Sequence, residues 1–295
     1  MPWNKKWFQF AVLMILAFVW GSSFILMKIG LKSFSSEQAA SIRIGSAFLV
    51  LLPYSIKNLK HLKKKDLKSL LIAGFIGSLV PAFLFTKAQT HIDSALAGML
   101  NSLTPVFTFI IGLLFFKSTF KNAQLIGIIL GLVGASGLIT MGSGLQLDTF
   151  NSYALLIVLA TTCYGVNINE VKARLTHLSG VQITSLSFFF IGPVAIFYLL
   201  TTDINQVTQS DGWYIHLGAL ALLGIMGTAI AMLVMNTLIR YASAVFASSV
   251  TYIIPIFAIL WGVLDGESIS LLHIVFMGVI LTGVYMINRL KTKRD

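Results

Sequence analysis

Long apolar runs separated by short polar gaps dominate the chain. Ten runs reach the length of about 20 residues that crosses the hydrocarbon core of a bilayer. They cover residues 8–29, 38–56, 68–88, 94–116, 123–141, 152–172, 182–201, 213–239, 244–264 and 270–289. Lipid offers no partner to backbone N–H and C=O groups, so such runs fold as helices. The pattern predicts an all-α polytopic membrane protein with ten transmembrane helices.

The stretch from Leu70 to Ser118 recurs 150 positions later without a gap. Nine pairs are identical, and they include three glycine pairs and one proline pair: Gly74 and Gly224, Gly77 and Gly227, Gly112 and Gly262, Pro105 and Pro255. Five spans in each copy is an odd number, so the second copy inserts upside down. We therefore predict two inverted five-helix repeats, residues 1–144 and 145–295, that form one structural unit. Inverted repeats are typical of secondary transporters with a midplane site; the alternative is a duplication that only enlarged a helical bundle.

Composition and charge agree with a membrane location. The chain of 295 residues is 57% hydrophobic and 11% charged, whereas soluble domains are about a quarter charged. The net charge of +11 does not indicate nucleic acid, because the basic residues lie in short gaps between apolar runs. Of the 21 Lys and Arg, 17 fall on one side of the predicted topology, which is the cytoplasmic side by the positive-inside rule. We expect a multi-pass protein of the cytoplasmic (inner) membrane with both termini in the cytoplasm.

The first apolar run, Phe8 to Ile29, is longer than the core of a signal peptide, about 7–15 residues. We expect it to be retained as the first span.

Two prolines near the middle of spans 4 and 9 suggest kinked helices at a solute pathway. The rings of Pro105 and Pro255 each remove a hydrogen bond to the carbonyl four residues earlier. Those carbonyls belong to Asn101 and Thr251, which also carry polar side chains. Lipid would not tolerate unpaired carbonyls, so we expect both positions on a cavity wall. The alternative is a packing kink whose carbonyl bonds a neighbouring Ser or Thr.

A weaker match at a shift of 144 aligns the first and sixth spans. It sets Trp20 on Tyr164, and polar residues follow on both helices: Ser22, Ser23, Asn167 and Asn169. Such groups either line a solute pathway or bond neighbouring helices. We include Asn236 and Tyr252 among the pathway candidates.

Arg43 and Lys87 are the two cations expected below the headgroups at the outer side. A cation at depth is costly unless it snorkels or finds a partner. Lys87 is close enough to the end of span 3 to snorkel, and Arg43 could pair with Glu37 or hold helices together through carbonyls. If either residue faces the cavity, an anionic or zwitterionic solute is favoured.

Few groups suit acid–base or metal chemistry. Glu170, near the inner end of span 6, is the acid closest to mid-membrane, and the five histidines fall in or near loops without metal-ligand spacing. We expect these histidines to be solvated, and we expect no cofactor and no metal. The single Cys163 lies in an apolar run, so no disulfide framework is available.

Recurrent glycines in span 5 predict close packing of helices. Gly127, Gly131, Gly134 and Gly137 lie near one helical face, where another backbone can approach, within one chain or between two. Gly74, Gly77, Gly224 and Gly227 serve packing, or else leave room for a solute or for bending.

Several stretches resemble the drug/metabolite transporter superfamily, specifically its ten-span EamA-type members. The first span carries Trp20-Gly21-Ser22-Ser23-Phe24 followed by Lys28 and Gly30, the second carries Ser41-Ile42-Arg43, and Gly266-Glu267-Ser268 precedes the last span. The first copy has Lys117 where the second has Glu267, so that acid has no counterpart in the first copy. The resemblance implies two inverted repeats, export or import of small organic solutes, and a central cavity lined by spans 1, 3, 4, 6, 8 and 9.

We therefore predict a secondary transporter, not an enzyme, that moves a small organic solute (an amino acid, metabolite or drug-like compound) by alternating access. The alternatives are a flippase-like carrier of amphipathic or lipid-linked compounds and a membrane-embedded enzyme. Its expected partners are the solute and the lipid bilayer, without nucleic acid, in a monomer or homodimer. Asn101→Ala or Thr251→Ala is expected to impair transport while insertion stays intact.

Overall fold

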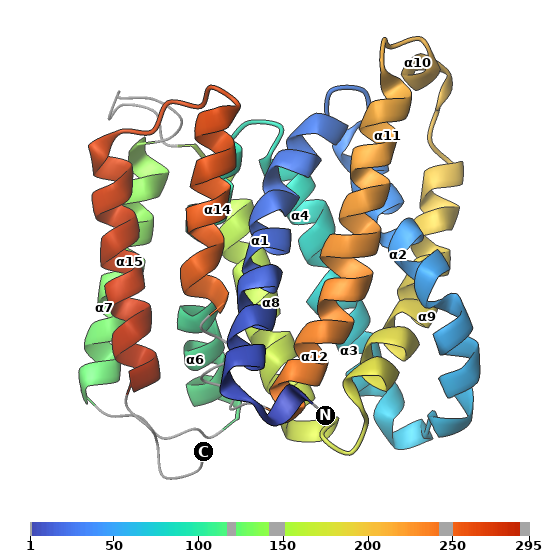
Figure 1. The fold of residues 1–295 in the computed structure, drawn as a ribbon, viewed down its shortest axis with the longest axis horizontal. Helices are drawn as coiled ribbons and strands as arrows, with labels where there is room; N and C mark the ends of the chain where they lie inside the picture. The colour runs from blue at the N-terminus through green and yellow to red at the C-terminus, as the bar shows by residue number, and fades with distance from the viewer. Residues whose placement is uncertain (1, 117–121, 142–150, 242–249, 290–295) are drawn as a thin grey trace.

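The computed structural model describes residues 2–116, 122–141, 151–241 and 250–289. Within these ranges the regular structure is entirely helical, and no strand occurs. The long helices run roughly side by side along one direction (Figure 1). The predicted all-helical class is therefore confirmed.

The helices follow one another with short connections. In order they are η1 (Pro2–Asn4), α1 (Lys6–Gly30), α2 (Ser36–Asn58), η2 (Leu59–His61), η3 (Lys64–Asp66), α3 (Leu67–Gly74), η4 (Phe75–Leu79), α4 (Val80–Ala88), α5 (Ser94–Asn101), α6 (Thr104–Phe115), α7 (Asn122–Met141), α8 (Ala154–Arg174), α9 (Gly180–Leu200), α10 (Asn205–Thr208), α11 (Trp213–Leu222), η5 (Leu223–Ile230), α12 (Ala231–Tyr241), α14 (Val250–Leu264) and α15 (Leu271–Arg289).

Seven helical stretches are long and apolar enough to cross a membrane. They are Lys6–Gly30, Ser36–His61, Lys64–Ala88, Ser94–Phe115, Ala154–Arg174, Gly180–Leu200 and Trp213–Leu238. Three shorter apolar helices, Gln124–Thr140, Val250–Leu264 and Leu271–Ile287, coincide with the predicted spans 5, 9 and 10. Each predicted span thus contains a helix, although the first six residues of span 9 lie outside the described part. The count of ten spans in two inverted repeats stays a prediction.

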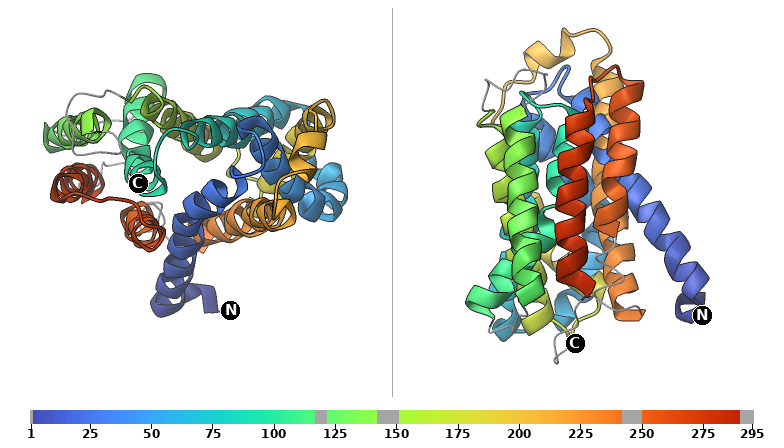
Figure 2. Two further views of the ribbon diagram at one scale, coloured as in Figure 1. Left: turned by 90° about the horizontal axis from the view of Figure 1, so that it is seen from above. Right: turned by 90° about the vertical axis from the view of Figure 1, so that its left-hand side faces the viewer.

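The helices pack in pairs that bring distant parts of the chain together. α7 packs on α15 and α2 packs on α9; α1 contacts α14, and α6 contacts α8. Seen along the helices, α7 and α15 form one end of the molecule next to α6 and α14 (Figure 2). The remaining long helices gather at the other end.

Glycines allow the backbones of α7 and α15 to touch. A β-carbon at Gly127 would lie 2.6 Å from the carbonyl oxygen of Gly283, and one at Gly283 would collide with the carbonyl oxygen of Gly127. Gly134 approaches the Phe276 carbonyl in the same way, at 2.8 Å. The predicted packing role of the span 5 glycines is confirmed within one chain.

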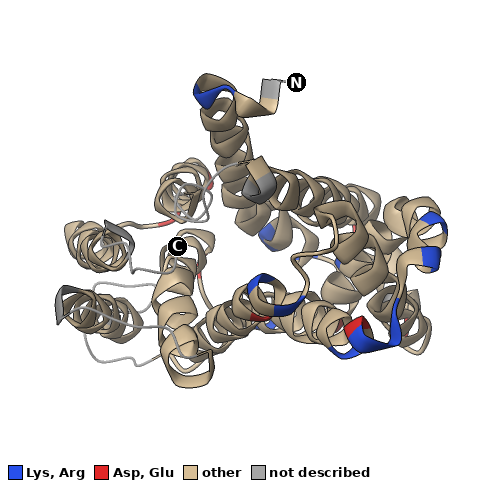
Figure 3. Ribbon diagram, turned by 90° about the horizontal axis from the view of Figure 1, so that it is seen from below, with Lys and Arg blue, Asp and Glu red and all other residues tan. Residues whose placement is uncertain are grey.

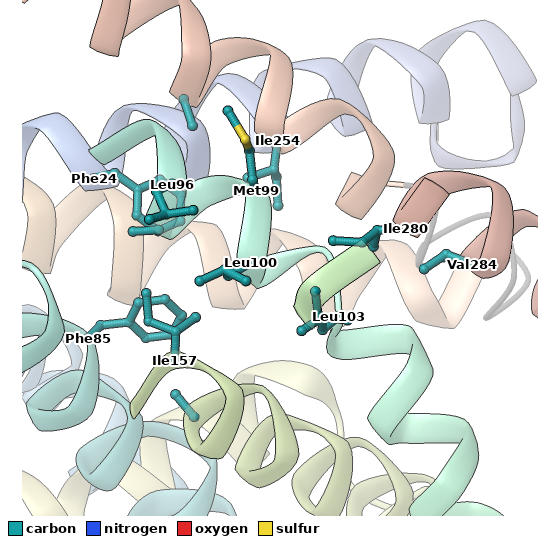
Figure 4. Close-up of a cluster of buried hydrophobic side chains, with 14 of the residues drawn as sticks. Phe24, Phe85, Leu96, Met99, Leu100, Leu103, Ile157, Ile254, Ile280 and Val284 are labelled. Atoms are coloured by element: carbon teal, nitrogen blue, oxygen red, sulfur yellow. The ribbon is translucent and has the colours of Figure 1, made fainter. Parts of the chain in front are cut away.

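The largest buried apolar cluster lies where α1, α4, α5, α8, α14 and α15 converge. Phe24, Phe85, Met99, Leu100 and Leu103 belong to it and are almost inaccessible to solvent (Figure 4). Leu103 lies between α5 and α6, where the helix is interrupted. Both residues of the interruption, Ser102 and Leu103, are buried.

The helices α2 and α9 begin with the same capping motif. The Oγ of Ser35 accepts a hydrogen bond from the Gln38 backbone N–H at 3.2 Å, while the Gln38 side chain accepts one from the Ser35 backbone N–H at 3.0 Å. Ser179 and Gln182 repeat this arrangement at 3.2 and 2.8 Å. Each box satisfies two backbone donors that a helix start leaves free.

Basic residues gather at the end of the bundle where α1 begins and α2 ends, which we call the basic end. Figure 3 shows Lys and Arg at this end, on α1 and on the segment that joins α2 to α3. Four lysines lie in that segment, Lys60, Lys63, Lys64 and Lys65, and Lys57 and Lys68 flank it at the ends of α2 and α3.

Candidate functional site

Two π-helical segments interrupt α-helices at matching places in the two halves. η4 covers Phe75–Leu79 and η5 covers Leu223–Ile230, so a shift of 150 places the first inside the second. Pro81 follows η4 and cannot donate to the carbonyl four residues earlier, which explains the local change of hydrogen-bond pattern there. π-Helical turns occur frequently at functional sites.

Each π-segment touches a helix of the other half through a glycine. A β-carbon at Gly77 would lie 2.7 Å from the amide oxygen of Asn167 on α8, and one at Gly227 would lie 2.9 Å from the Ser23 Oγ on α1. Asn167 and Ser23 are the residues that the shift of 144 aligns. The indole N–H of Trp20 also donates to the Gly227 carbonyl at 2.9 Å. α1 and α8 therefore hold the π-segments in matching ways.

The glycines before these contacts allow the approach of α9 and α2. A β-carbon at Gly74 would lie 3.0 Å from the Ser187 carbonyl oxygen, and one at Gly224 would collide with the Arg43 carbonyl oxygen. The space beside each glycine is therefore occupied by a neighbouring helix. The packing interpretation of these glycines holds in this structure.

A small cavity, which we call the polar cavity because half of its lining residues are polar, lies beside the first π-segment. It is lined by Ala73, Ser78, Asn167, Val171, Ile183, Thr184, Ser187, Phe188, Met232 and Asn236. The volume open to the centre of a water molecule is ≈ 30 Å³, enough for about two waters at about 10–15 Å³ each. Two of the three buried side-chain atoms without a hydrogen-bond partner in the described ranges, Asn167 Oδ1 and Ser187 Oγ, belong to its wall.

The structure brings two of the predicted pathway residues together at this cavity. Asn167 and Asn236 both line it, and the Asn236 amide donates to the Thr184 hydroxyl at 2.8 Å. Spans 3, 6 and 8 contribute to the wall, and α9 (span 7) contributes as well. The described parts of spans 1, 4 and 9, which the resemblance also implies, do not line this cavity. Thr184, Ser187 and Ser78 were missed, because hydroxyl residues in apolar runs are common and nothing in the sequence distinguishes these.

The remaining polar residues of α1 face other partners. Ser22 accepts a hydrogen bond from the Trp261 indole on α14 at 2.8 Å and donates to the Phe18 carbonyl at 2.7 Å. Ser23 donates to the Val19 carbonyl at 3.0 Å. Ser22 therefore bonds a neighbouring helix, while Ser23 lies at the second π-segment.

Of the two alternatives for Arg43, pairing with Glu37 is wrong; Arg43 bonds another helix, through a hydroxyl and not a carbonyl. Its Nε donates to the Thr228 hydroxyl within η5 at 3.0 Å, and Tyr164 is the ionisable neighbour near enough for an electrostatic interaction. Glu37 pairs instead with Lys87, at 3.6 Å between carboxylate and ammonium. Lys87 is half exposed, 51% for the side chain, in agreement with snorkelling.

The proline helices differ from the expected pair of unpaired carbonyls. α5 ends at Asn101 and α6 begins at Thr104, so Pro105 occupies the first turn of a new helix. The Asn101 carbonyl accepts a hydrogen bond from the Thr104 hydroxyl at 2.9 Å, and the Thr251 carbonyl accepts one from Ser102 at 3.5 Å. Both carbonyls are therefore hydrogen-bonded, as expected from the alternative of a packing kink.

Both prolines nevertheless lie inside the protein. Pro105 and Pro255 are buried, and Pro255 is within α14. Tyr252 is partly buried against the main apolar cluster. None of these side chains lines the polar cavity.

A charged cluster that the sequence did not predict ties three segments at the end opposite the basic end. The Lys28 ammonium lies 2.6 Å from Asp265 and 2.8 Å from Glu267. Glu267 also accepts hydrogen bonds from the backbone N–H groups of Ser94 at 3.0 Å and Ala95 at 2.9 Å. Its side chain is only 3% exposed, so a carboxylate from before α15 caps the start of α5.

Motifs offered a signal for this cluster, because Lys28 and Gly266-Glu267-Ser268 carry part of the family resemblance. Their spatial proximity was not readable from the chain. Lys117 and Ser118, the first-copy counterparts of Glu267 and Ser268, lie outside the described residues.

Buried acids near the basic end bond neighbouring side chains. Glu170 is 4% exposed, accepts a hydrogen bond from Ser69 at 2.7 Å and lies 3.4 Å from Arg174. Asp66 lies 3.1 Å from the His177 ring. The expectation of solvated histidines is wrong for His273, which is 4% exposed and bonds Ser270. In the described part of the chain no cluster of His, Cys, Asp or Glu could hold a metal.

Comparison with known proteins identifies relatives along almost the whole chain. The profile of the EamA-like transporter family matches residues 7–140 and again 151–289. An "Uncharacterized inner membrane transporter YedA" from Escherichia coli (strain K12) is 28% identical, over 94% of this chain and 90% of its own length. An "Uncharacterized transporter" from Archaeoglobus fulgidus is 24% identical, over 97% and 99%. A "Probable terminal-alkyne amino-acid exporter" from Streptantibioticus cattleyicolor is 20% identical, over 94% and 92%.

A solved crystal structure shares the fold, with a TM-score of 0.62 over 96% of this chain and 98% of that chain at 14% identity. The two profile matches leave only short segments uncovered, and the matched relatives are named as transporters. On this evidence the chain belongs to the EamA-like transporter family.

Proposed function

We propose that the protein is a secondary transporter that moves a small organic solute across the cytoplasmic membrane by alternating access. Its membership in a transporter family supports transport in general. The observation that carries the proposal is the pair of π-segments, η4 and η5. Each lies mid-way along a long apolar helix and contacts a helix of the other half.

Alternating access requires that helices of the two halves move against each other, and these contacts join such helices at two places. η4 meets α8 at Gly77 and Asn167, while η5 meets α1 at Gly227, Ser23 and Trp20. Because both glycines lack a side chain, each π-segment touches a polar group of the other half directly, and these are the places where the helices would shift against one another. The polar cavity beside η4 would hold part of the solute after the helices separate.

Hydrogen-bonded clusters at the two ends would act as gates. At the end opposite the basic end, Lys28, Glu267 and the start of α5 are joined. At the basic end, Glu170 bonds Ser69 and joins α8 to α3. Opening one cluster while the other stays closed would expose the solute site to one side at a time.

The arrangement of the chain in the membrane is part of the proposal. Two inverted five-helix repeats, residues 1–144 and 145–295, are supported by the two family matches and by the matched contacts of α1 with α14 and of α8 with α6. The basic end would face the cytoplasm. The termini would then both be cytoplasmic.

Reconstitution of the full chain into proteoliposomes tests the function. Vesicles with and without the protein are incubated with a uniformly ¹³C-labelled extract of small metabolites, and the retained compounds are identified by mass spectrometry. We expect at least one unmodified solute to accumulate only in vesicles with the protein. Asn167→Ala and Asn236→Ala should slow its uptake by about tenfold or more, because each removes a polar group of the cavity wall.

Asn205→Ala is the matched control, because Asn205 is an exposed residue at the start of α10 and its substitution should leave uptake unchanged. Chemical conversion of the solute would indicate an enzyme, and movement of lipids alone would indicate a flippase. Either result, or equal retention with and without the protein, would contradict the proposal.

A further inference from the structure

Arg43 is a cation enclosed by other helices. In the first half of α2, from Ser36 to Phe48, every residue is buried or partly buried, and exposed residues begin at Leu49. The helix as a whole contacts α9, α4, α11 and η5, and Arg43 itself bonds Thr228 of η5. The Arg43 side chain therefore lies within the bundle and not at a lipid-facing surface.

The guanidinium of Arg43 has one hydrogen bond and no ion pair with a described acid. Nε donates to Thr228, while no described residue accepts a hydrogen bond from its two terminal nitrogens. These nitrogens are not sealed from solvent, since the buried atoms that lack a partner are found on Ser41, Asn167 and Ser187 only, as far as the chain is described. Four N–H donors on one planar group are thus available to a ligand.

The surroundings of Arg43 carry no compensating negative charge. Glu37, the nearest acid along the helix, is paired with Lys87, and Glu267 is taken up by Lys28 and the start of α5. A cation left without a counter-ion at such depth is costly and is a functional candidate by default.

Arg43 is attached to the same π-segment as Trp20. The Trp20 indole bonds the carbonyl of Gly227, and Arg43 bonds the hydroxyl of the next residue, Thr228. The neighbouring Tyr164 ring stacks on Phe85 with centroids 6.0 Å apart at 25°. A planar cationic fork therefore lies near aromatic surfaces at the moving element of the proposed transport cycle.

We propose that Arg43 binds the anionic group of the transported solute, and that this group is a carboxylate. The inference rests on the proposed transport function and adds the substrate class to it. A carboxylate accepts two parallel N–H bonds from the guanidinium fork, and it would supply the counter-charge that the bundle lacks. The aromatic rings nearby suit a solute whose remaining part is apolar.

A set of probes with one common body separates charge from shape. The full chain, purified in detergent, is titrated with 3-phenylpropionate, phenylalanine, 3-phenylpropionamide, 2-phenylethylamine and phenyl phosphate, and Kd is measured from thermal stabilisation. We expect the two carboxylates to bind at least about tenfold more tightly than the amide and the amine, because a charge-assisted bidentate pair is lost in the latter. Phenyl phosphate, whose tetrahedral dianion resembles a lipid headgroup, should bind more weakly than 3-phenylpropionate.

Variants then assign the preference to Arg43. Arg43→Gln should raise the Kd of 3-phenylpropionate by about tenfold or more and leave that of the amide unchanged, while Arg43→Lys should retain part of the preference. Lys32→Gln, which removes an exposed cation just after α1, is the matched control and should change neither. Binding of the amide by the Arg43 variants shows that they are folded.

The proposal is overturned if no carboxylate binds more tightly than the amide, if phosphate is preferred, or if Arg43→Gln keeps the carboxylate preference. A protein that shows the preference without moving any solute in vesicles would contradict the transport function but not the role of Arg43. Transport that is insensitive to Arg43→Gln would contradict only the role of Arg43.

Discussion

The two carboxylates that pair with Lys28 offer the sharpest test of how the cluster opposite the basic end is built. Glu267 and Asp265 lie at similar distances from the ammonium, 2.8 and 2.6 Å, but their side chains are 3% and 35% exposed. Glu267 alone also accepts the backbone N–H groups of Ser94 and Ala95. Removal of the Glu267 carboxylate should therefore lower the free energy of unfolding much more than removal of the Asp265 carboxylate.

The expected size follows from the bonds that each substitution breaks. A hydrogen bond to a charged group contributes about 1.5–3 kcal/mol, so Glu267→Ala, which leaves two backbone donors without an acceptor, should lower the free energy of unfolding by about 3–6 kcal/mol. Asp265→Ala breaks one partly exposed ion pair, worth about 0–1 kcal/mol. Lys28 keeps one partner in each variant.

Unfolding in mixed micelles of dodecyl maltoside and SDS, followed by far-ultraviolet circular dichroism, measures both variants against the wild type. Glu267→Gln should fall between them, because its amide oxygen still accepts one backbone N–H. Equal losses for the Glu267 and Asp265 variants would refute the assignment of Glu267 as the cap of α5.

Other substitutions have expected outcomes in the same assay. Gly165→Ala should lower the free energy of unfolding by about 1–3 kcal/mol, because its β-carbon would lie 2.9 Å from backbone atoms of α6; Gly278→Ala, which meets nothing within 4 Å, should cost nothing, and a comparable loss there would contradict the packing argument. Ser179→Ala should cost about 1 kcal/mol through loss of the capping box of α9, and no change would show that water replaces the cap. Trp20→Phe should cost about 1 kcal/mol because the carbonyl of Gly227 loses its donor, and an unchanged stability would argue against that hydrogen bond.

Helices and their approximate limits were predictable because each apolar run must satisfy its own backbone in lipid. The glycines of α7 were also readable, since their spacing alone requires a close neighbour. Which helix fills that space was not, because α15 lies about 150 residues further along the chain. The proline ring predicted an interruption near Pro105. The sequence did not decide whether the freed carbonyl faces a cavity or bonds a neighbouring hydroxyl, and in the structure it bonds the hydroxyl of Thr104.

Long-range polar contacts account for most of what the sequence did not predict. Glu37 is the acid nearest to Arg43 along the chain, whereas its actual partner, Thr228, is 185 residues away. Glu267 and the start of α5 are likewise 173 residues apart. The packing of helices determines which side chains in a bundle meet. A single sequence indicates that packing only through weak repeats such as the paired glycines.

The π-segments also fix the phase of the helices that contain them. One extra residue in a turn rotates everything beyond it by about 100° relative to a continuous α-helix. Deleting a single residue from 75–79 would restore the regular winding and turn the preceding stretch, including the face that carries Ala73, away from its present neighbours. The number of residues in this segment, more than their chemical identity, therefore determines which side of α3 contacts α8 and α9.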